Sequence, residues 1–234
     1  MTAEQYLQEH NISESFALDF GLAWDDNYLN IPIKDANGEV LFLKSRNLHY
    51  GEGGDTAPKY KNPAGSHATL FNLQAAAKAP NIFLCEGEID CLKLIEEGIP
   101  SVSSTGGSGT FREEWVPLLK GKNLWICYDN DTAGRAGIRQ LLTFFPNAIV
   151  LQLPEGVKDI CEYFAFGCTK SEFFKLPQCT SEEWLISNRL PDYDLVSAED
   201  YSHRPLVTHP WLIENIVYLR FSLPNKVPRL LYLF

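Results

Sequence analysis

The chain of 234 residues has no long hydrophobic run. No apolar stretch approaches the roughly 20 uncharged residues that a membrane-spanning helix needs. The first residues, MTAEQYLQEHN, are polar. The sequence therefore predicts neither a secretory signal nor a membrane anchor, and we expect a cytoplasmic protein without a membrane partner.

The sequence also has no paired metal-binding motif and little positive charge. Its six cysteines include no Cys-x-x-Cys pair, and its five histidines lack metal-ligand spacing. We therefore interpret Cys85 and Cys127, which lie inside apolar runs, as buried, reduced thiols. Lys and Arg total 20 against 30 Asp and Glu, a net charge of −10. This balance disfavours a general nucleic-acid binder, so any such function must depend on a local basic patch.

Two kinds of pattern divide the chain. Residues 2–20 have helical spacing of apolar side chains, and residues 28–49 contain two alternating apolar runs around Asn37-Gly38, a strong hairpin signal. From residue 81 to residue 153, short apolar runs alternate with helical segments. We expect an α/β domain with a mostly parallel, Rossmann-like sheet and flanking helices, preceded by a small α+β subdomain.

Acidic residues follow successive strands of the predicted parallel sheet. Glu86 follows the run 81–85, Asp129 and Asp131 follow the run 123–128, and Asp159 comes shortly after 147–153. Asp90 lies four residues beyond Glu86, on the same side of a helix. Ligands of open parallel sheets bind outside the carboxyl ends of the strands. Carboxylates this close repel each other unless a cation neutralises them, and hard oxygen ligands suit Mg²⁺.

A structural interpretation of these acidic residues stays open. An Asp-x-Asp pair in a loop is usually a turn or a helix cap, and Asp131 is well placed to cap a helix from residue 132. The combination of Glu86, Asp129, Asp131 and Asp159 at successive strand ends favours a metal site over that interpretation.

Several ordered motifs together resemble one family. FLCEGEIDCLKL, SSTGGSGTF, WICYDNDTAGRAGIRQL and IVLQLPEGVKDICEYF look like the Toprim domain of bacterial-type DNA primases, including those of phages and plasmids. Upstream, IPIKDANGEVLFLKSRNL and APKYKNPAGSHATLFN resemble the N-terminal subdomain of the primase polymerase core. The resemblance implies a primase subdomain over residues 1–73, a Toprim domain over 74–170 and a C-terminal linker or tail over 171–234.

The resemblance also implies roles for individual residues. Glu86 resembles the catalytic Toprim glutamate, an acid/base group or metal ligand. Asp129 and Asp131 resemble the pair that binds Mg²⁺ (or Mn²⁺), and Asp90 and Asp159 match further acidic positions of that site. The implied basic residues, which would contact the template or the nucleotide, are Arg46 and Lys59, with Lys61 beside them.

The function implied is template-directed synthesis of a short RNA primer on single-stranded DNA by a metal-dependent nucleotidyltransferase. The partners implied are the single-stranded template, nucleoside triphosphates and a replicative helicase, separate or fused. Two alternatives stay open: a Toprim nuclease, and a non-catalytic module that binds single strands or a helicase.

The sequence departs from the family in two respects. The family usually has a Lys soon after the position of Phe71, where this chain has Asn72 and Leu73; Lys61 or Lys78 would have to substitute. A zinc ribbon, which initiating primases carry, has no counterpart among these residues. The segment 209–218, HPWLIENIVY, faintly resembles the entry to a RecA-like helicase domain, so the tail is either the start of such a domain or a segment packed on the core.

Overall fold

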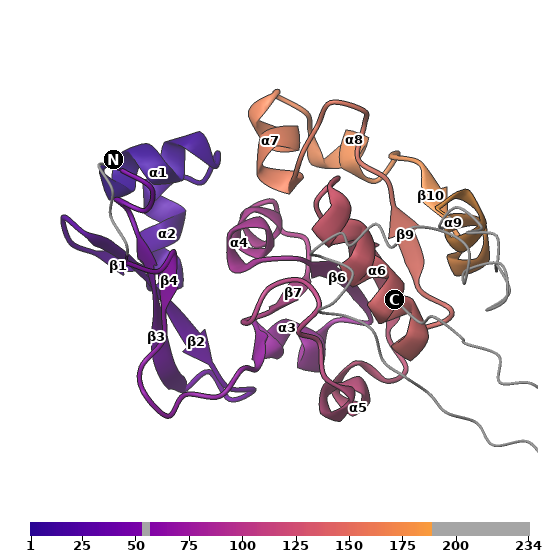
Figure 1. Cartoon of the computed structure of the whole chain (residues 1–234), viewed down its shortest axis with the longest axis horizontal. Coiled ribbons are helices and arrows are strands. Elements are labelled where there is room, and N and C mark those ends of the chain that lie inside the picture. Colours follow the sequence, from indigo (N-terminus) through magenta and orange to yellow (C-terminus); the bar gives the residue numbers. More distant parts are fainter. Residues whose placement is uncertain (53–56, 189–234) are drawn as a thin grey trace, which may run out of the picture. The chain divides into compact units, whose positions relative to one another are not determined.

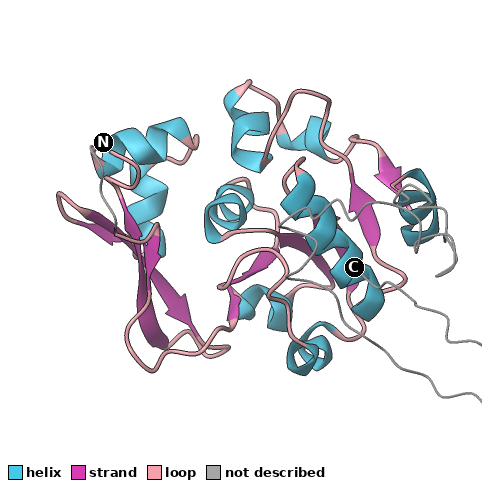
Figure 2. Ribbon diagram, viewed as in Figure 1, coloured by secondary structure: helices cyan, strands magenta, loops and turns pink. Residues whose placement is uncertain are grey.

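The computed structural model describes residues 1–52 and 57–188 (Figures 1 and 2). The described residues belong to one compact unit. The helicase-like segment 209–218 and the rest of the chain from residue 189 lie outside the described residues. Within the described part, no helix has the length and hydrophobicity needed to cross a membrane.

The described residues of the N-terminal part contain an antiparallel sheet of four strands. Its order is β1 (Ala23–Trp24), β2 (Tyr28–Lys34), β3 (Val40–Asn47) and β4 (Tyr60–Lys61). The β2–β3 turn is held by the Asp35 carboxylate, which accepts hydrogen bonds from the N–H groups of Asn37 and Glu39 at 2.8 and 2.9 Å. Gly38 takes a φ of 93°, a conformation that glycine adopts without strain. The predicted hairpin is therefore confirmed.

Two helices precede this sheet, α1 (Ala3–Glu9) and α2 (Glu14–Phe20). The helical spacing predicted over residues 2–20 is confirmed as two helices, with a break between them. Asn11 has a φ of 53°, and Ser13 caps α2 by accepting from the Phe16 N–H at 3.3 Å. A residue that favours N-caps competes with a continuous helix, so the chain turns here. Buried side chains of both helices pack with those of β2 in one core.

Among the described residues the second sheet has six strands, and its four central strands are parallel. The order is β10 (Gln178–Cys179), β9 (Ile149–Leu151), β8 (Asn123–Cys127), β6 (Asn81–Cys85), β7 (Ser101–Ser104) and β5 (Leu70–Phe71), with β10 and β5 antiparallel at the edges. The predicted mostly parallel α/β sheet is thus confirmed. The three-part domain division stays a prediction; the sheet itself includes β5, upstream of residue 73, and β10, beyond residue 170.

Helices cover this sheet on both faces (Figure 1). They are α3 (Leu73–Lys78), α4 (Glu88–Glu96), the 3₁₀ helix η1 (Glu113–Trp115), α5 (Val116–Leu119), α6 (Thr132–Phe144), α7 (Ile160–Ala165), α8 (Lys170–Phe173) and α9 (Ser181–Ser187). Ile82 and Leu84 of β6 pack with α6 and α5, whereas Phe83 and Cys85 pack with α4 and α7. Pro117 lies in the first turn of α5, where a missing N–H is tolerated.

A buried ion pair joins the N-terminal sheet to the helices of the second sheet. Lys44 of β3 donates from Nζ to Glu88 Oε1 at 2.6 Å and to the Thr105 carbonyl oxygen at 2.7 Å. Only 5% of Lys44 and 2% of Glu88 is exposed. The ammonium also lies 4.5 Å from the centre of the Tyr60 ring. Both charges are therefore compensated by each other and by hydrogen bonds, which a buried ion pair requires.

We predict that Glu88→Gln strongly destabilises the protein, because it leaves the Lys44 charge buried without a counter-ion. The expected loss in unfolding free energy is about 3–5 kcal/mol, measured by urea unfolding. The matched control is Glu114→Gln at the exposed Arg112–Glu114 pair, 3.3 Å long, which should change stability little. Equal losses in the two variants would contradict this assignment.

Candidate metal and nucleotide site

The register of two parallel strands brings two acidic segments to the same level. Cys85, the last residue of β6, lies opposite Cys127, the last residue of β8. Glu86 then follows β6 directly, before the Gly87 N-cap of α4, and Asp129 follows β8 by two residues. Both carboxylates thus leave the carboxyl edge of the sheet, where ligands of such folds bind. Cys85 and Cys127 are buried and free, as predicted.

A glycine in α6 allows this helix to pack against Asp129. A side chain at Gly134 would overlap with the Asp129 carbonyl oxygen. The Gly134 N–H donates to Asp131 Oδ1 at 2.7 Å, so Asp131 does cap α6. The cap uses one carboxylate oxygen and leaves the other, so capping and metal binding are compatible at Asp131.

Two further carboxylates approach each other from α4 and α7. Asp159 caps α7 by accepting from the Glu162 N–H at 2.8 Å, and Asp90 accepts from the Cys161 N–H at 3.4 Å. Ligand atoms of Asp90, Asp159 and Cys161 all lie within 4.8 Å of one another, a group that could hold a metal ion. The sequence analysis gave Cys161 no role at this site. Its position two residues after Asp159 was the signal that could have indicated one.

Glu86, Asp90, Asp129, Asp131 and Asp159, here called the acidic cluster, interact electrostatically. Burial raises the pKa of Asp129 to about 8, and the charges of Asp90 and Glu86 contribute. Burial, with the charge of Asp159, raises the pKa of Asp90 to about 7. Burial also raises the pKa of Glu86, and the Asp131 charge raises it further. A hydrogen bond with Ser108 has the opposite effect and lowers it. Without a cation the cluster therefore retains protons at pH values where isolated carboxylates are charged.

Lys158 is a partial counter-ion that sequence reasoning missed. Its Nζ lies 3.2 Å from Asp159 Oδ2 and 3.7 Å from Asp129 Oδ2. Its side chain is 64% exposed, so these pairs are weak and easily displaced. The Lys158 carbonyl also accepts from the Asn130 N–H at 2.7 Å, which ties the loop after β8 to the loop before α7.

The geometry of Glu86 fits a metal ligand. Its Oε2 is shielded from solvent and has no hydrogen-bond partner among the described residues. An unpartnered buried carboxylate oxygen is costly unless a ligand compensates it. The oxygen-rich donor set of the acidic cluster suits a hard divalent cation.

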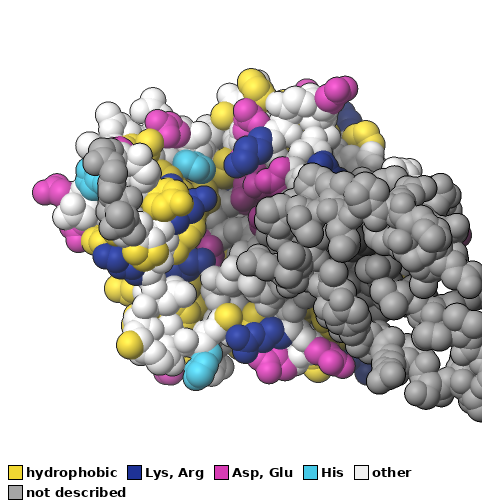
Figure 3. All heavy atoms as spheres, in the orientation of Figure 1, with side chains coloured by type: hydrophobic (Ala, Val, Ile, Leu, Met, Phe, Trp, Pro, Cys, Tyr) yellow, Lys and Arg dark blue, Asp and Glu magenta, His cyan; other side chains and the backbone are white. Residues whose placement is uncertain are grey.

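The predicted basic residues lie on β3, on β4 and just before β4. Arg46 is the cross-strand neighbour of Tyr60, and the Lys61 ammonium lies 4.4 Å from the centre of the Tyr28 ring. Partial desolvation and the Arg46 charge lower the pKa of Lys59, while Asp129 and Glu86 oppose this change. Lys59 is thus within electrostatic range of the acidic cluster. Figure 3 shows Lys and Arg side chains gathered over the N-terminal part of the chain, on the face seen in Figure 1.

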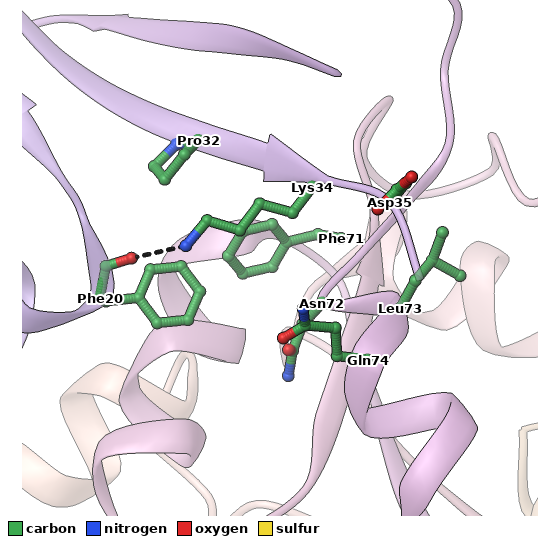
Figure 4. Close-up of a pocket in the computed structure, with 8 residues that line it drawn as sticks. All are labelled: Phe20, Pro32, Lys34, Asp35, Phe71, Asn72, Leu73 and Gln74. Atoms are coloured by element: carbon green, nitrogen blue, oxygen red, sulfur yellow. Dashed lines mark hydrogen bonds between the residues drawn. The ribbon is translucent and has the colours of Figure 1, made fainter. Parts of the chain in front are cut away.

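A small pocket lies at the position where the family's usual Lys is missing (Figure 4). Its volume is about 40 Å³, and Asn72 and Leu73 are among its lining residues. Lys34 of β2 points into it and donates from Nζ to the Phe20 carbonyl oxygen at 3.0 Å. A different lysine, from β2, therefore lies beside that position.

Comparison with known proteins shows what the chain is similar to. Residues 83–164 match the Toprim-like family model. A DNA primase from Aquifex aeolicus is 32% identical over 155 residues, which cover 62% of this chain and 29% of the relative. The chain thus resembles DNA primases but spans less than a third of that relative's length.

Solved structures show the same fold. The RNA polymerase domain of the Mycobacterium tuberculosis primase has a TM-score of 0.66 and 18% identity, covering 86% of this chain and 83% of that one. The primase fragment of the bacteriophage T7 primase-helicase protein has a TM-score of 0.60 and 23% identity, covering 73% and 72%. The described residues therefore have the fold of a primase catalytic core.

The raised pKa of Asp129 gives a prediction about stability. The folded apo protein keeps a proton on Asp129 up to a pKa of about 8, whereas the ordinary value is 3.8. Between these values the folded state binds more protons, so stability falls as pH rises. Asp129→Asn removes this loss and should raise the Tm in EDTA at about pH 9 more than at about pH 5.

The control for this measurement is Asp25→Asn. Hydrogen bonds from the N–H groups of Asn27 and Tyr28 lower the pKa of Asp25, so loss of its charge should not raise the Tm at either pH. A gain for Asp129→Asn that is the same at both pH values would contradict the proposed repulsion.

Proposed function

We propose that this chain is the catalytic core of a DNA primase, which synthesises a short primer on single-stranded DNA during replication. The observation that carries this proposal is the acidic cluster at the carboxyl edge of β6 and β8, with Arg46 and Lys59 close to it. The Toprim-like match and the primase fold support it.

The acidic cluster is the proposed site for Mg²⁺ or Mn²⁺. Glu86, Asp129 and Asp131 would hold the ion from one side, and Asp90 and Asp159 from α4 and α7. Such an ion, when bound, supplies positive charge for the triphosphate and the departing pyrophosphate. The orphaned Glu86 Oε2 and the raised pKa values of Asp129 and Asp90 both favour a cation here.

The proposed reaction is nucleotidyl transfer. The 3′ oxygen of one nucleotide forms a bond to the α-phosphorus of a nucleoside triphosphate, and the bond to the β-phosphate bridging oxygen breaks. Glu86 would accept the hydroxyl proton or orient the metal. Its raised pKa, caused mainly by burial, makes Glu86 a better proton acceptor than an ordinary carboxylate.

The basic residues are proposed to bind phosphate groups of the template and nucleotide. Arg46, Lys59 and Lys61 provide a local positive surface in a chain of net charge −10. A replicative helicase, fused or separate, is the proposed partner, since the T7 neighbour is a fragment of a primase-helicase protein.

The direct test is primer synthesis on single-stranded templates with all four nucleoside triphosphates, with and without Mg²⁺ or Mn²⁺. Metal-dependent primers would support the proposal. Metal-dependent cutting of the template without nucleotide incorporation would indicate a nuclease. Binding of single strands without primer synthesis or cutting would indicate a non-catalytic binding module.

We predict that Glu86→Gln lowers primer synthesis at least about 10²-fold, because it removes a charged acid/base group without changing its shape. Single-strand binding, measured by fluorescence anisotropy, should persist. Glu155→Gln, an exposed carboxylate in the loop before α7, is the control and should retain activity. Full activity of Glu86→Gln would remove Glu86 from the reaction.

We also predict that Asp129→Asn combined with Asp131→Asn abolishes Mn²⁺ binding in calorimetry while the protein stays folded. The asparagine that replaces Asp131 would still cap α6, since Asn is a good N-cap residue. The control pair is Asp25→Asn with Asp26→Asn, neighbouring carboxylates outside the cluster. Unchanged Mn²⁺ affinity in the Asp129/Asp131 variant would show that the ion binds elsewhere.

A further inference from the structure

Arg46 is surrounded by aromatic rings rather than carboxylates. Its guanidinium carbon lies 5.2 Å from the centre of the Tyr6 ring, 5.3 Å from that of Tyr60 and 5.7 Å from that of Tyr50. These distances are typical of cation–π contacts. Tyr60 is its cross-strand neighbour on β4, and Tyr6 comes from the buried face of α1. The guanidinium is thus fixed by two separate elements.

The charge of Arg46 is left without a carboxylate partner among the described residues. Lys44, two residues earlier on the same face of β3, is neutralised by Glu88. Burial raises the pKa of Tyr6 to about 12, against the opposing charge of Arg46, so this phenol is no counter-ion. The β3 face therefore carries one compensated cation and one uncompensated cation.

Two donors of Arg46 are also unused. Nε and Nη1 are shielded from solvent and donate to no group in the described part of the protein. Guanidinium donors held in place without a protein partner are suited to carboxylate or phosphate oxygens. The Asp90 charge acts on Tyr6, and the Asp159 charge acts on His10, whose ring is tilted against the Tyr6 ring with the two ring centres 4.2 Å apart. The unpartnered donors thus lie within electrostatic range of the acidic cluster, which would repel any anion unless a metal ion intervened.

We propose that Tyr6 and Tyr60 are positioning residues, which hold the Arg46 guanidinium between their rings so that Nε and Nη1 stay available for a phosphate group. This inference rests on the proposed function, in which phosphate and metal ion meet at the acidic cluster. The phosphate belongs either to the nucleoside triphosphate or to the strand backbone. Tyr6 and Tyr60 act through Arg46 and touch no substrate themselves.

The test is a double-mutant cycle on the full chain. Affinities are measured for ATP with Mg²⁺ and, separately, for an oligodeoxythymidylate, with wild type, Tyr60→Leu, Arg46→Ala and the combined variant. Tyr60→Leu should weaken binding of the relevant ligand about threefold to tenfold, the scale of a cation–π contact. In the Arg46→Ala background the same substitution should have no further effect. Tyr60→Phe, which keeps the ring, should restore most of the affinity.

The two ligands separate the phosphate sources. Weaker binding of ATP alone would show that the phosphate group belongs to the nucleoside triphosphate. Weaker binding of the oligonucleotide, with a shallower salt dependence in Arg46→Ala, would show that it belongs to the strand backbone. Tyr28→Leu is the matched control: its ring contacts Lys61, so any effect it has should be the same in the wild-type and Arg46→Ala backgrounds. If Tyr60→Leu does not fold, Arg46→Lys replaces it, since it keeps the charge but loses the planar donors.

Several outcomes would overturn the inference. An equal loss from Tyr60→Leu with and without Arg46 would give Tyr60 a merely structural role. An equal loss of affinity in Tyr60→Phe and Tyr60→Leu would show that the Tyr60 ring does not matter for binding. Wild-type affinity of Arg46→Lys would show that the planar guanidinium donors are not needed. Wild-type protein that binds neither ligand would overturn the proposed function as well, whereas binding that is unaffected by Tyr60→Leu overturns this inference alone.

Discussion

The register between β6 and β8 is the constraint on which the rest of the site depends. Both strands are covered by helices on each face, so their apolar side chains fix the pairing of Cys85 with Cys127. Charged residues follow these two strands where they end, at Glu86 and Asp129. A shift of one residue would separate these carboxylates and reverse the buried faces. The stability of the hydrophobic sheet thus holds together charges that repel each other.

The site also requires positive charge near this edge of the sheet that does not neutralise the acidic cluster. The buried Lys44–Glu88 pair fixes β3 against α4, and the alternation of side chains along β3 then places Arg46 beside the same region. Lys158 compensates part of the acidic cluster through exposed, exchangeable contacts. Lys44 is therefore structural, Lys158 can be displaced, and Arg46 keeps a charge that no carboxylate of the described residues neutralises. This division explains how an acidic protein could bind phosphate groups locally.

Much of this arrangement followed from sequence, and the parts that did not depend on long-range contacts. The hairpin at Asn37-Gly38 and the strand–helix alternation are local signals, and the carboxylates could be placed because parallel strands end at one edge. The Lys44–Glu88 pair could not be foreseen, because residues 44 positions apart in sequence give no sign of contact. Cys161 and Lys158 were missed for a similar reason: each takes its role from segments that only folding brings near. The helix break at Asn11 was overlooked because the apolar spacing continues across it.

The central claim is that the acidic cluster is a single divalent-metal site. Crystals grown or soaked with Mn²⁺, measured at a wavelength where manganese scatters anomalously, test it most directly. The account predicts an anomalous peak at about 2.0–2.4 Å from carboxylate oxygens of Glu86, Asp129 or Asp131, with Lys158 moved away from Asp129. Clear density for the site with Lys158 still paired to Asp129 and Asp159, and with no peak within the cluster, would contradict it.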